Sequence, residues 1–243
     1  MKAAYVQKEL KRMSDPDKAA MLQRFFKTGP GHYGEGDIFI GVMVPQLRQI
    51  AKKFSQLPLE EVRVLLYSRI HEERLVALLI LIWKYRYGAS GNKGKEEIVK
   101  FYLDHIKQVN NWDLVDVSAP NIVGVHLLFD DRDDRRQLLY RLARSENVWE
   151  RRIAIVATLH FIRKGDFYDT LKIAEILLQD RHDLIHKAVG WMLREVGKRD
   201  AAAEEAFLDK HYSIMPRTML RYAIERLSED KRLHYQKILL ERR

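Results

Sequence analysis

A helical pattern that recurs about every 34 to 40 residues is the feature that most constrains the fold of this chain. Four segments each place a cation before small or aliphatic residues with the spacing of an amphipathic helix, and they begin at Arg74, Arg152, Lys187 and Arg221. These starts are 78, 35 and 34 residues apart, and the wide gap spans about two periods, with Trp112 near its midpoint. A period of this length with two helices per unit predicts an α-solenoid of HEAT-like repeats.

Helical spacing fills the rest of the chain, and no segment alternates strictly between polar and apolar residues as a half-buried strand does. Predicted helices begin at Val44 and Pro58 and otherwise cover residues 2–13, 15–27, 71–87, 96–109, 112–129 with a break at Pro120, 134–144, 148–163, 167–179, 183–198, 201–211, 216–227 and 231–241. Residues 88–94 are predicted to form a flexible turn, and the charged run 130–136 a solvated turn. We therefore expect an all-α protein in which residues 1–243 form one domain of stacked helix pairs, with one helix of each pair lining a concave basic groove.

The composition supports an ordered chain with a basic surface. Hydrophobic residues make up 47% of the 243 residues, which is enough for a substantial core. Lys and Arg outnumber Asp and Glu by 43 to 34, a net charge of +9. Such an excess favours a polyanionic partner such as nucleic acid, although interspersed charges of both signs also fit ordinary solubility.

Several classes of protein are disfavoured by what the sequence lacks. There is no cysteine, hence no disulfide framework and no thiol-based zinc site. His182 and His186 are four residues apart, but no third ligand follows at a diagnostic spacing, so we expect no metal and no cofactor. The longest apolar run, Leu75 to Trp83, is far shorter than the ~20 residues of a membrane span. We expect a cytoplasmic, soluble monomer that binds no membrane.

The segment from Asn110 to Pro120 has the spacing of a short helix with two functional side chains on one face. Asn110 and Asp113 are spaced as a capping box that opens a helix. Trp112 and Asp116 are four residues apart, so an aromatic ring and a carboxylate lie side by side. The pair allows two interpretations, a core anchor with a carboxylate that satisfies backbone groups freed by Pro120, or a functional site.

A second aromatic stripe lies near the C-terminus. Lys187, Trp191 and Arg194 follow the i, i+4, i+7 spacing of one helical face. A Trp between two cations is unusual in a core and typical of a surface that binds nucleic acid. Gly190 beside it is expected to let a substrate backbone approach closely. The adjacent pair Arg151-Arg152 adds charge one repeat earlier, whereas Trp149 and Trp83 are expected in the core.

The one long glycine-rich loop runs from Thr28 to Asp37. Gly29, Gly31 and Gly34 match the letters of a dinucleotide-binding motif, but no strand precedes them and no βαβ unit surrounds them, so that function is rejected. A lid, a loop at the edge of a substrate site, or a plain connector remain as alternatives.

The chain resembles the AlkD family of HEAT-repeat DNA glycosylases, which excise N3- and N7-alkylated purines. Three motifs carry the resemblance: Trp112-Asp113-Leu114-Val115-Asp116, Asn147-Val148-Trp149-Glu150-Arg151-Arg152-Ile153-Ala154-Ile155 and Lys187-Ala188-Val189-Gly190-Trp191-Met192-Leu193-Arg194-Glu195. The resemblance implies that Trp112 and Trp191 are the two active-site tryptophans, that Asp116 is the catalytic carboxylate, and that Arg152 is a basic residue beside them. Phe25 stands where a member of the family carries a tyrosine near the lesion.

The resemblance also implies a partner and a reaction. The partner is double-stranded DNA that carries alkylated purines, and the family acts without flipping the base into a pocket. Phosphates would be held without sequence readout by Arg151, Arg152, Lys187 and Arg194. The alternative is a non-catalytic helical-repeat module that binds nucleic acid or an acidic protein, in which Asp116 has no chemical role. Release of free base from alkylated DNA separates the two.

Overall fold

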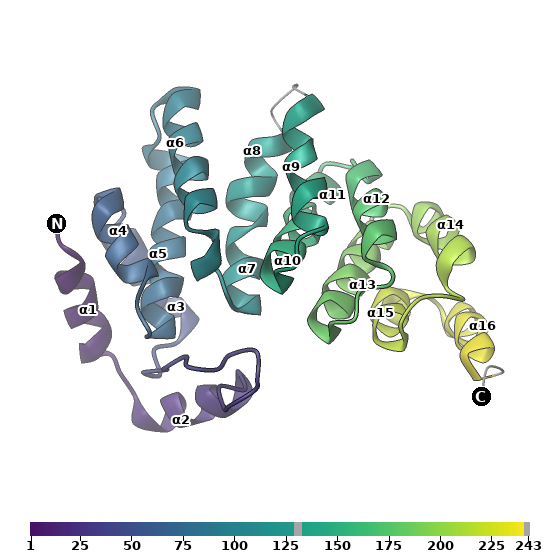
Figure 1. The fold of residues 1–243 in the computed structure, drawn as a ribbon, viewed down its shortest axis with the longest axis horizontal. Coiled ribbons are helices and arrows are strands. Elements are labelled where there is room, and N and C mark those ends of the chain that lie inside the picture. The colour runs from purple at the N-terminus through teal and green to yellow at the C-terminus, as the bar shows by residue number, and fades with distance from the viewer. Residues whose placement is uncertain (129–132, 241–243) are drawn as a thin grey trace. The chain divides into compact units, whose positions relative to one another are not determined.

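The structure is a computed structural model that describes residues 1–128 and 133–240, and the chain divides into two compact units, Met1–Ser118 and Ala119–Arg243. Helices dominate both units (Figure 1), and over the described residues the only extended pairing is an isolated bridge between Ile38 and Ile70. The predicted all-α helical-repeat class is confirmed. The HEAT assignment, the single domain and the concave groove stay predictions.

The first unit is built around one buried helix. Its elements are α1 (Ala3–Arg12), α2 (Pro16–Phe25), α3 (Val44–Lys53), α4 (Leu59–Leu66), α5 (His71–Trp83), the π-helix η1 (Lys84–Gly88), α6 (Gly91–Asp104), the 3-10 helix η2 (Ile106–Gln108) and α7 (Trp112–Ser118). Helix α5 is buried from His71 to Ile82 and packs against α3, α4 and α7. A helix that is apolar on all sides must be enclosed, and the other helices of the unit enclose this one.

The polar residues at the start of α5 attach the surrounding segments to it. The Glu72 carboxylate accepts hydrogen bonds from the backbone N–H groups of Ile40 and Gly41, at 3.0 and 2.8 Å. Glu73 accepts one from the Gln7 side chain of α1, at 2.9 Å. Because α5 begins with four polar residues before its apolar run, its first turn can hold backbone and side chains that would otherwise be buried without partners.

The second unit consists of successive helix pairs. Its elements are the π-helix η3 (Pro120–Gly124), α8 (Val125–Leu128), α9 (Asp133–Ala143), α10 (Val148–Ala157), α11 (Leu159–Ile162), α12 (Tyr168–Leu177), α13 (Asp183–Gly197), α14 (Ala201–His211), α15 (Arg217–Ala223), the 3-10 helix η4 (Ile224–Arg226) and α16 (Glu229–Leu240). Helix α13 packs against both α10 and α15, so these three helices form one layer. The repeated cations Arg152, Lys187 and Arg221 lie on these three helices in turn, as the period predicts.

Local sequence signals account for most helix starts. Asp15 accepts hydrogen bonds from two backbone N–H groups at the start of α2, where Pro16 is the first helical residue. Asn147 caps α10 and Asp200 caps α14 in the same way. The break predicted at Pro120 is confirmed as the end of α7 and the beginning of η3.

Three local expectations are wrong or only partly right. Residues 88–94 do not form a flexible turn, because η1 extends to Gly88 and α6 already begins at Gly91. Gly91, the first residue of α6, has a φ of 66°, which glycine adopts without the strain that other residues incur. Of the charged run 130–136, residues 130–132 lie outside the described residues and α9 begins at Asp133. Trp83 and Trp149 are partly exposed rather than core residues.

Gly190 serves helix packing rather than substrate approach. It is buried in α13, and a Cβ atom at this position would collide with the carbonyl oxygen of Met219 and with the side chain of Tyr222 on α15. The absence of a side chain therefore allows α13 and α15 to pack closely. The expectation that Gly190 lies open to a substrate backbone is corrected by this contact.

Substitution of Gly190 by alanine tests the packing. Alanine is the better helix former by ~1 kcal/mol, so a solvent-facing Gly→Ala change would stabilise the protein. At Gly190 the clash is with backbone, and we expect Gly190→Ala to lower the free energy of unfolding by about 1–3 kcal/mol, measured by urea denaturation. Gly88→Ala is the control, because a Cβ there meets nothing within 4 Å. Equal or greater stability of Gly190→Ala would contradict the packing role.

Candidate functional site

Three consecutive residues lie at the start of helix α7, and the side chain of each makes a polar contact. The Asn111 side-chain oxygen accepts a hydrogen bond from the Trp112 backbone N–H at 2.8 Å, and Asp113 accepts one from Leu114 at 2.8 Å. The capping box predicted from Asn110 and Asp113 is wrong, because each of these bonds joins a side chain to the N–H of the next residue. The Asn110 side-chain oxygen is buried and has no hydrogen-bond partner among the described residues.

A buried charged network lies beneath the start of α7. The His71 ring lies between two carboxylates, with Nδ1 3.1 Å from Asp37 and Nε2 2.7 Å from Asp113. Arg74 donates to the other Asp37 oxygen at 2.7 Å, and the Asn111 amide donates to Asp37 at 3.0 Å. Both ring nitrogens lie within hydrogen-bond distance of a carboxylate, which favours the doubly protonated ring, so that two cations meet two anions.

The pKa values agree with this charge state. Burial alone would lower the pKa of His71, but Asp113 and Asp37 outweigh burial and raise it above 6.5. Burial alone would raise the pKa of Asp37, but hydrogen bonding to His71 and the charge of Arg74 outweigh burial and lower it. The sequence patterns did not predict this network. Its one visible signal is a charged tetrad, residues 71–74, placed directly before nine apolar residues.

The Trp112 ring is held on one side and remains partly exposed. It stacks on Phe26 with ring centroids 5.0 Å apart and an angle of 11° between the planes. Phe25 meets it edge-on at 5.9 Å and is itself 62% exposed. The indole Nε1 donates a hydrogen bond to the Tyr33 hydroxyl at 3.2 Å. Trp112 is thus neither a buried core anchor nor a free surface ring.

Asp116 lies one turn after Trp112 on the same partly exposed face of α7. The other carboxylate of the motif, Asp113, pairs with the buried His71. This ion pair gives Asp113 a structural role in the first unit.

The predicted stripe of the second unit lies on α13 with its side chains partly exposed. The Trp191 indole donates to Glu195 at 3.1 Å. The Lys187 ammonium lies 2.6 Å from Asp183, and Arg194 forms an ion pair with Glu225 of η4. These acidic partners were not anticipated from the spacing alone.

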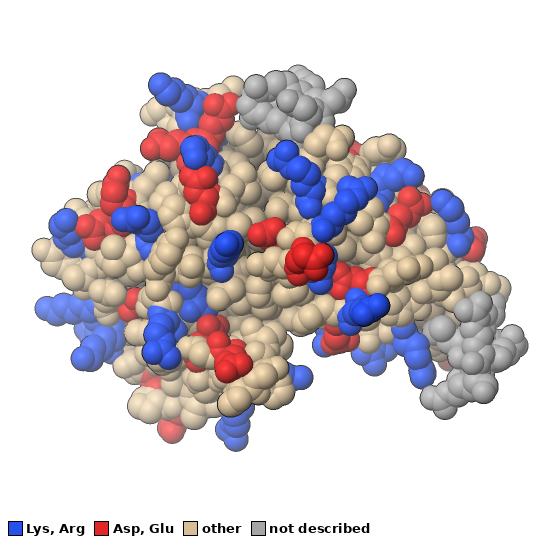
Figure 2. Space-filling model, viewed as in Figure 1, with Lys and Arg blue, Asp and Glu red and all other residues tan. Residues whose placement is uncertain are grey.

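The adjacent arginines Arg151 and Arg152 are more enclosed than predicted. Arg151 pairs with Asp180 at 2.6 Å and also donates to two backbone carbonyls. Arg152 is only 5% exposed and donates to the carbonyl of Leu184 at 2.5 Å. A direct phosphate contact would require more exposure of Arg152, so its burial favours a role in holding α13 against α10. Figure 2 shows acidic and basic side chains interspersed across the visible face.

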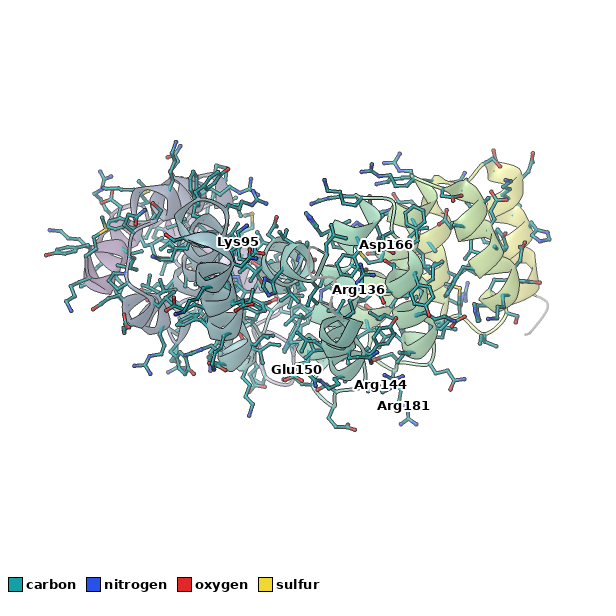
Figure 3. All side chains as sticks on the ribbon, turned by 90° about the horizontal axis from the view of Figure 1, so that it is seen from above. Lys95, Arg136, Arg144, Glu150, Asp166 and Arg181 are labelled. Atoms are coloured by element: carbon teal, nitrogen blue, oxygen red, sulfur yellow. The ribbon has the colours of Figure 1, made fainter. Side chains whose placement is uncertain are left out.

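Other cations of the second unit extend outward or pair locally. Arg136 of α9 lies beside Asp166 (Figure 3), with an N–O distance of 3.0 Å, and it also pairs with Asp169 at 2.7 Å. Arg181, in the turn before α13, is exposed and extends away from the unit (Figure 3). Cations of the second unit therefore lie outside the predicted stripe as well as within it.

Comparison with known proteins was made on sequence and on structure. The model of a family described as DNA alkylation repair enzyme matches residues 6–227. The chain belongs to this family. A solved structure titled "Predicted DNA alkylation repair enzyme from Enterococcus faecalis" is similar with a TM-score of 0.69 and 20% identity, over 89% of this chain and 98% of that one. At this identity the likeness shows the fold alone. A search of curated proteins finds no match.

Of the two histidines considered as metal ligands, one caps helix α13 and the other contacts a backbone carbonyl just before that helix. His182 accepts a hydrogen bond from the Leu184 N–H at 3.1 Å, and His186 contacts the Asp180 carbonyl at 2.5 Å. Over the described part of the chain, no three His, Asp or Glu side chains are grouped to hold a metal ion. Over the same residues, no helix is long and apolar enough to cross a membrane.

The His71 network predicts a pH dependence of the repair enzyme's stability. A histidine whose pKa is raised by folding contributes stability that is complete below 6.5 and is lost as pH rises through its folded pKa. The free energy of unfolding, from urea titrations, should therefore fall above pH 6.5, and His71→Gln should remove most of that fall.

Two observations keep this test specific. Burial raises the pKa of Glu204 in the second unit to about 7. Glu204 therefore lowers the free energy of unfolding as pH rises from 4.5 to about 7, and has no further effect above that range. Above that pH, the difference in free energy of unfolding between wild type and His71→Gln measures the contribution of the network, which includes Asp37, Asp113 and Arg74. His32→Gln, an exposed loop position, is the control. A wild-type slope retained in His71→Gln would show that the ring is not charged between its carboxylates.

Proposed function

We propose that this alkylation repair enzyme is a DNA glycosylase that hydrolyses the N-glycosidic bond of N3- and N7-alkylated purines in double-stranded DNA. One observation carries the proposal. Helix α7 presents an aromatic ring and a carboxylate, Trp112 and Asp116, on the same partly exposed face. The cytoplasmic location and the monomeric state remain part of the proposal.

The chemistry suits these two residue types. Alkylation at N3 or N7 makes the purine cationic, so it leaves with the bonding electron pair and becomes neutral without protonation by the protein. Positive charge then develops on the deoxyribose, and a carboxylate at Asp116 stabilises it. Water adds to the sugar carbon, and Asp116 orients that water and accepts its proton. Little or no base flipping is needed, because the carboxylate acts on the deoxyribose and not on the base.

The aromatic rings supply the binding surface for the damaged nucleotide. A cation over the face of a Trp ring is attracted by about 0.5–2 kcal/mol, and an alkylated purine is such a cation. Trp112 is prearranged for this by its stack on Phe26, and Trp191 is the second candidate ring. The surface cations hold the phosphates, and exposed ion pairs such as Lys187–Asp183 are weak enough to exchange an acidic partner for a phosphate.

Asp116→Asn tests the catalytic assignment. The amide keeps the shape and removes the charge, so the excision rate of N7-methylguanine under single-turnover conditions should fall by about 10²–10³. Affinity for DNA should stay the same or increase, because a negative charge is removed from a surface that faces a polyanion. Melting temperature measured on the same preparation should be close to that of the wild type.

Asp113→Asn is the matched control on the same helix. It removes one partner of the buried His71 and keeps the charge of Asp116, so it should lower the melting temperature, and its loss of activity per folded molecule should be far smaller than that of Asp116→Asn. An Asp116→Asn variant that cleaves at the wild-type rate per folded molecule would falsify the catalytic role. A wild-type protein that binds alkylated DNA and releases no base would instead favour the non-catalytic module.

The salt dependence of DNA binding tests the contribution of Lys187. Each phosphate neutralised contributes about −0.9 to the slope of log affinity against log salt. Lys187→Ala should therefore make the slope shallower by roughly one unit, measured by fluorescence anisotropy on a short duplex. Lys172→Ala is the control, because Lys172 of α12 is likewise paired with a nearby acid, at 3.2 Å. An unchanged slope for Lys187→Ala would remove this residue from the interface.

A further inference from the structure

The glycine-rich loop from Thr28 to Asp37 is closed at its base by a single side chain. The Gln23 amide nitrogen of α2 donates to the Thr28 hydroxyl and to the Asp37 carbonyl, each at 2.8 Å. Its amide oxygen accepts the Phe39 N–H at 3.1 Å. Gln23 therefore joins the beginning of the loop to its end, as in a compact Ω-loop whose ends lie close together.

The glycines allow the loop to fold back on α2. A Cβ atom at Gly34 would lie 2.6 Å from the Phe26 carbonyl oxygen, so only glycine fits at this contact. Gly31 and Gly36 have φ values of 75° and 84°, in the left-handed region that other residues rarely adopt. The Gly31 N–H is held by the Glu35 carboxylate at 2.9 Å. The loop is thus a fixed element rather than a connector without contacts.

Two side chains of this loop reach the first residues of α7. Tyr33 accepts the hydrogen bond of the Trp112 indole at 3.2 Å. Asp37, at the loop's end, accepts from Asn111 at 3.0 Å and is joined through the His71 ring to Asp113. Each of the three residues that open α7 is therefore connected to the loop.

The two kinds of contact restrict different motions of the Trp112 ring. Stacking on Phe26 fixes the plane of the indole but restrains sliding or rotation within that plane only weakly. A hydrogen bond at the ring edge is directional and restrains that remaining freedom. The Tyr33 hydroxyl supplies this second restraint.

We propose that Tyr33 is a positioning residue for base excision, and that the glycine-rich loop exists to hold its hydroxyl against the Trp112 indole. The role in excision rests on the proposed function, whereas the hold on the indole does not. Tyr33 acts through Trp112, so its effect on the reaction must vanish when Trp112 is absent.

The first experiment observes the indole directly. The chain has four tryptophans, so a ¹⁵N–¹H correlation spectrum contains four indole N–H signals, and Trp112→Phe identifies the one from Trp112. In Tyr33→Phe this signal should shift and exchange faster with solvent, while the other three stay in place. Tyr5→Phe is the control, since it removes a hydroxyl from an exposed ring of the same unit. An unchanged Trp112 signal in Tyr33→Phe would overturn the proposal.

The second experiment is a double-mutant cycle on excision. Tyr33→Phe should lower the single-turnover rate by about 3- to 10-fold, the size expected of one neutral hydrogen bond, with DNA affinity unchanged. In a Trp112→Phe background the same change should have no further effect. Independent, additive losses would overturn the proposal, because Tyr33 would then act on DNA itself. Failure of the wild type to release base would rule out the proposed function and the role of Tyr33 in excision. The indole signal would still show whether Tyr33 holds Trp112.

Discussion

The contact on which the first unit depends is the protonated His71 ring between Asp37 and Asp113. It joins three separate segments, the end of the glycine-rich loop, the first turn of α5 and the first turn of α7. Arg74 balances the second negative charge, so the buried group is neutral overall. Removing one member would leave an uncompensated buried charge, which typically costs 3–5 kcal/mol. The position of the Trp112 helix is therefore tied to the charge state of one histidine.

Those elements of the fold that depend on local sequence could be predicted. Helix spacing and the break at Pro120 each involve residues only a few positions apart, and both are present. The period of the repeats placed Arg152 and Lys187 on adjacent helices of one layer. Where local reasoning failed, as at residues 88–94, the glycines were taken as a sign of a turn, although Gly91 and Gly94 lie within α6.

Only part of the candidate site could be predicted from residue spacing along the sequence. The shared face of Trp112 and Asp116 follows from helical spacing, and the structure agrees with it. The network beneath them joins residues 34, 42 and 74 positions apart, and no spacing rule connects such distant residues. The same limit explains Gly190, whose role depends on α15. It also explains the acidic partners of Arg151 and Arg194, both of which lie on other segments of the unit.

The cost of burying charge indicates what the network is for. Well-packed hydrophobic residues in place of a buried ion pair are often neutral or stabilising by 1–4 kcal/mol, so stability alone does not account for four charged side chains in this position. Hydrogen bonds differ from hydrophobic contacts in being directional. The side chains of Asn111, Trp112 and Asp113 each form a hydrogen bond of this kind. The network therefore provides orientation of the first turn of α7, and orientation is what a stacked ring and a carboxylate one turn later require if both are to meet the same sugar.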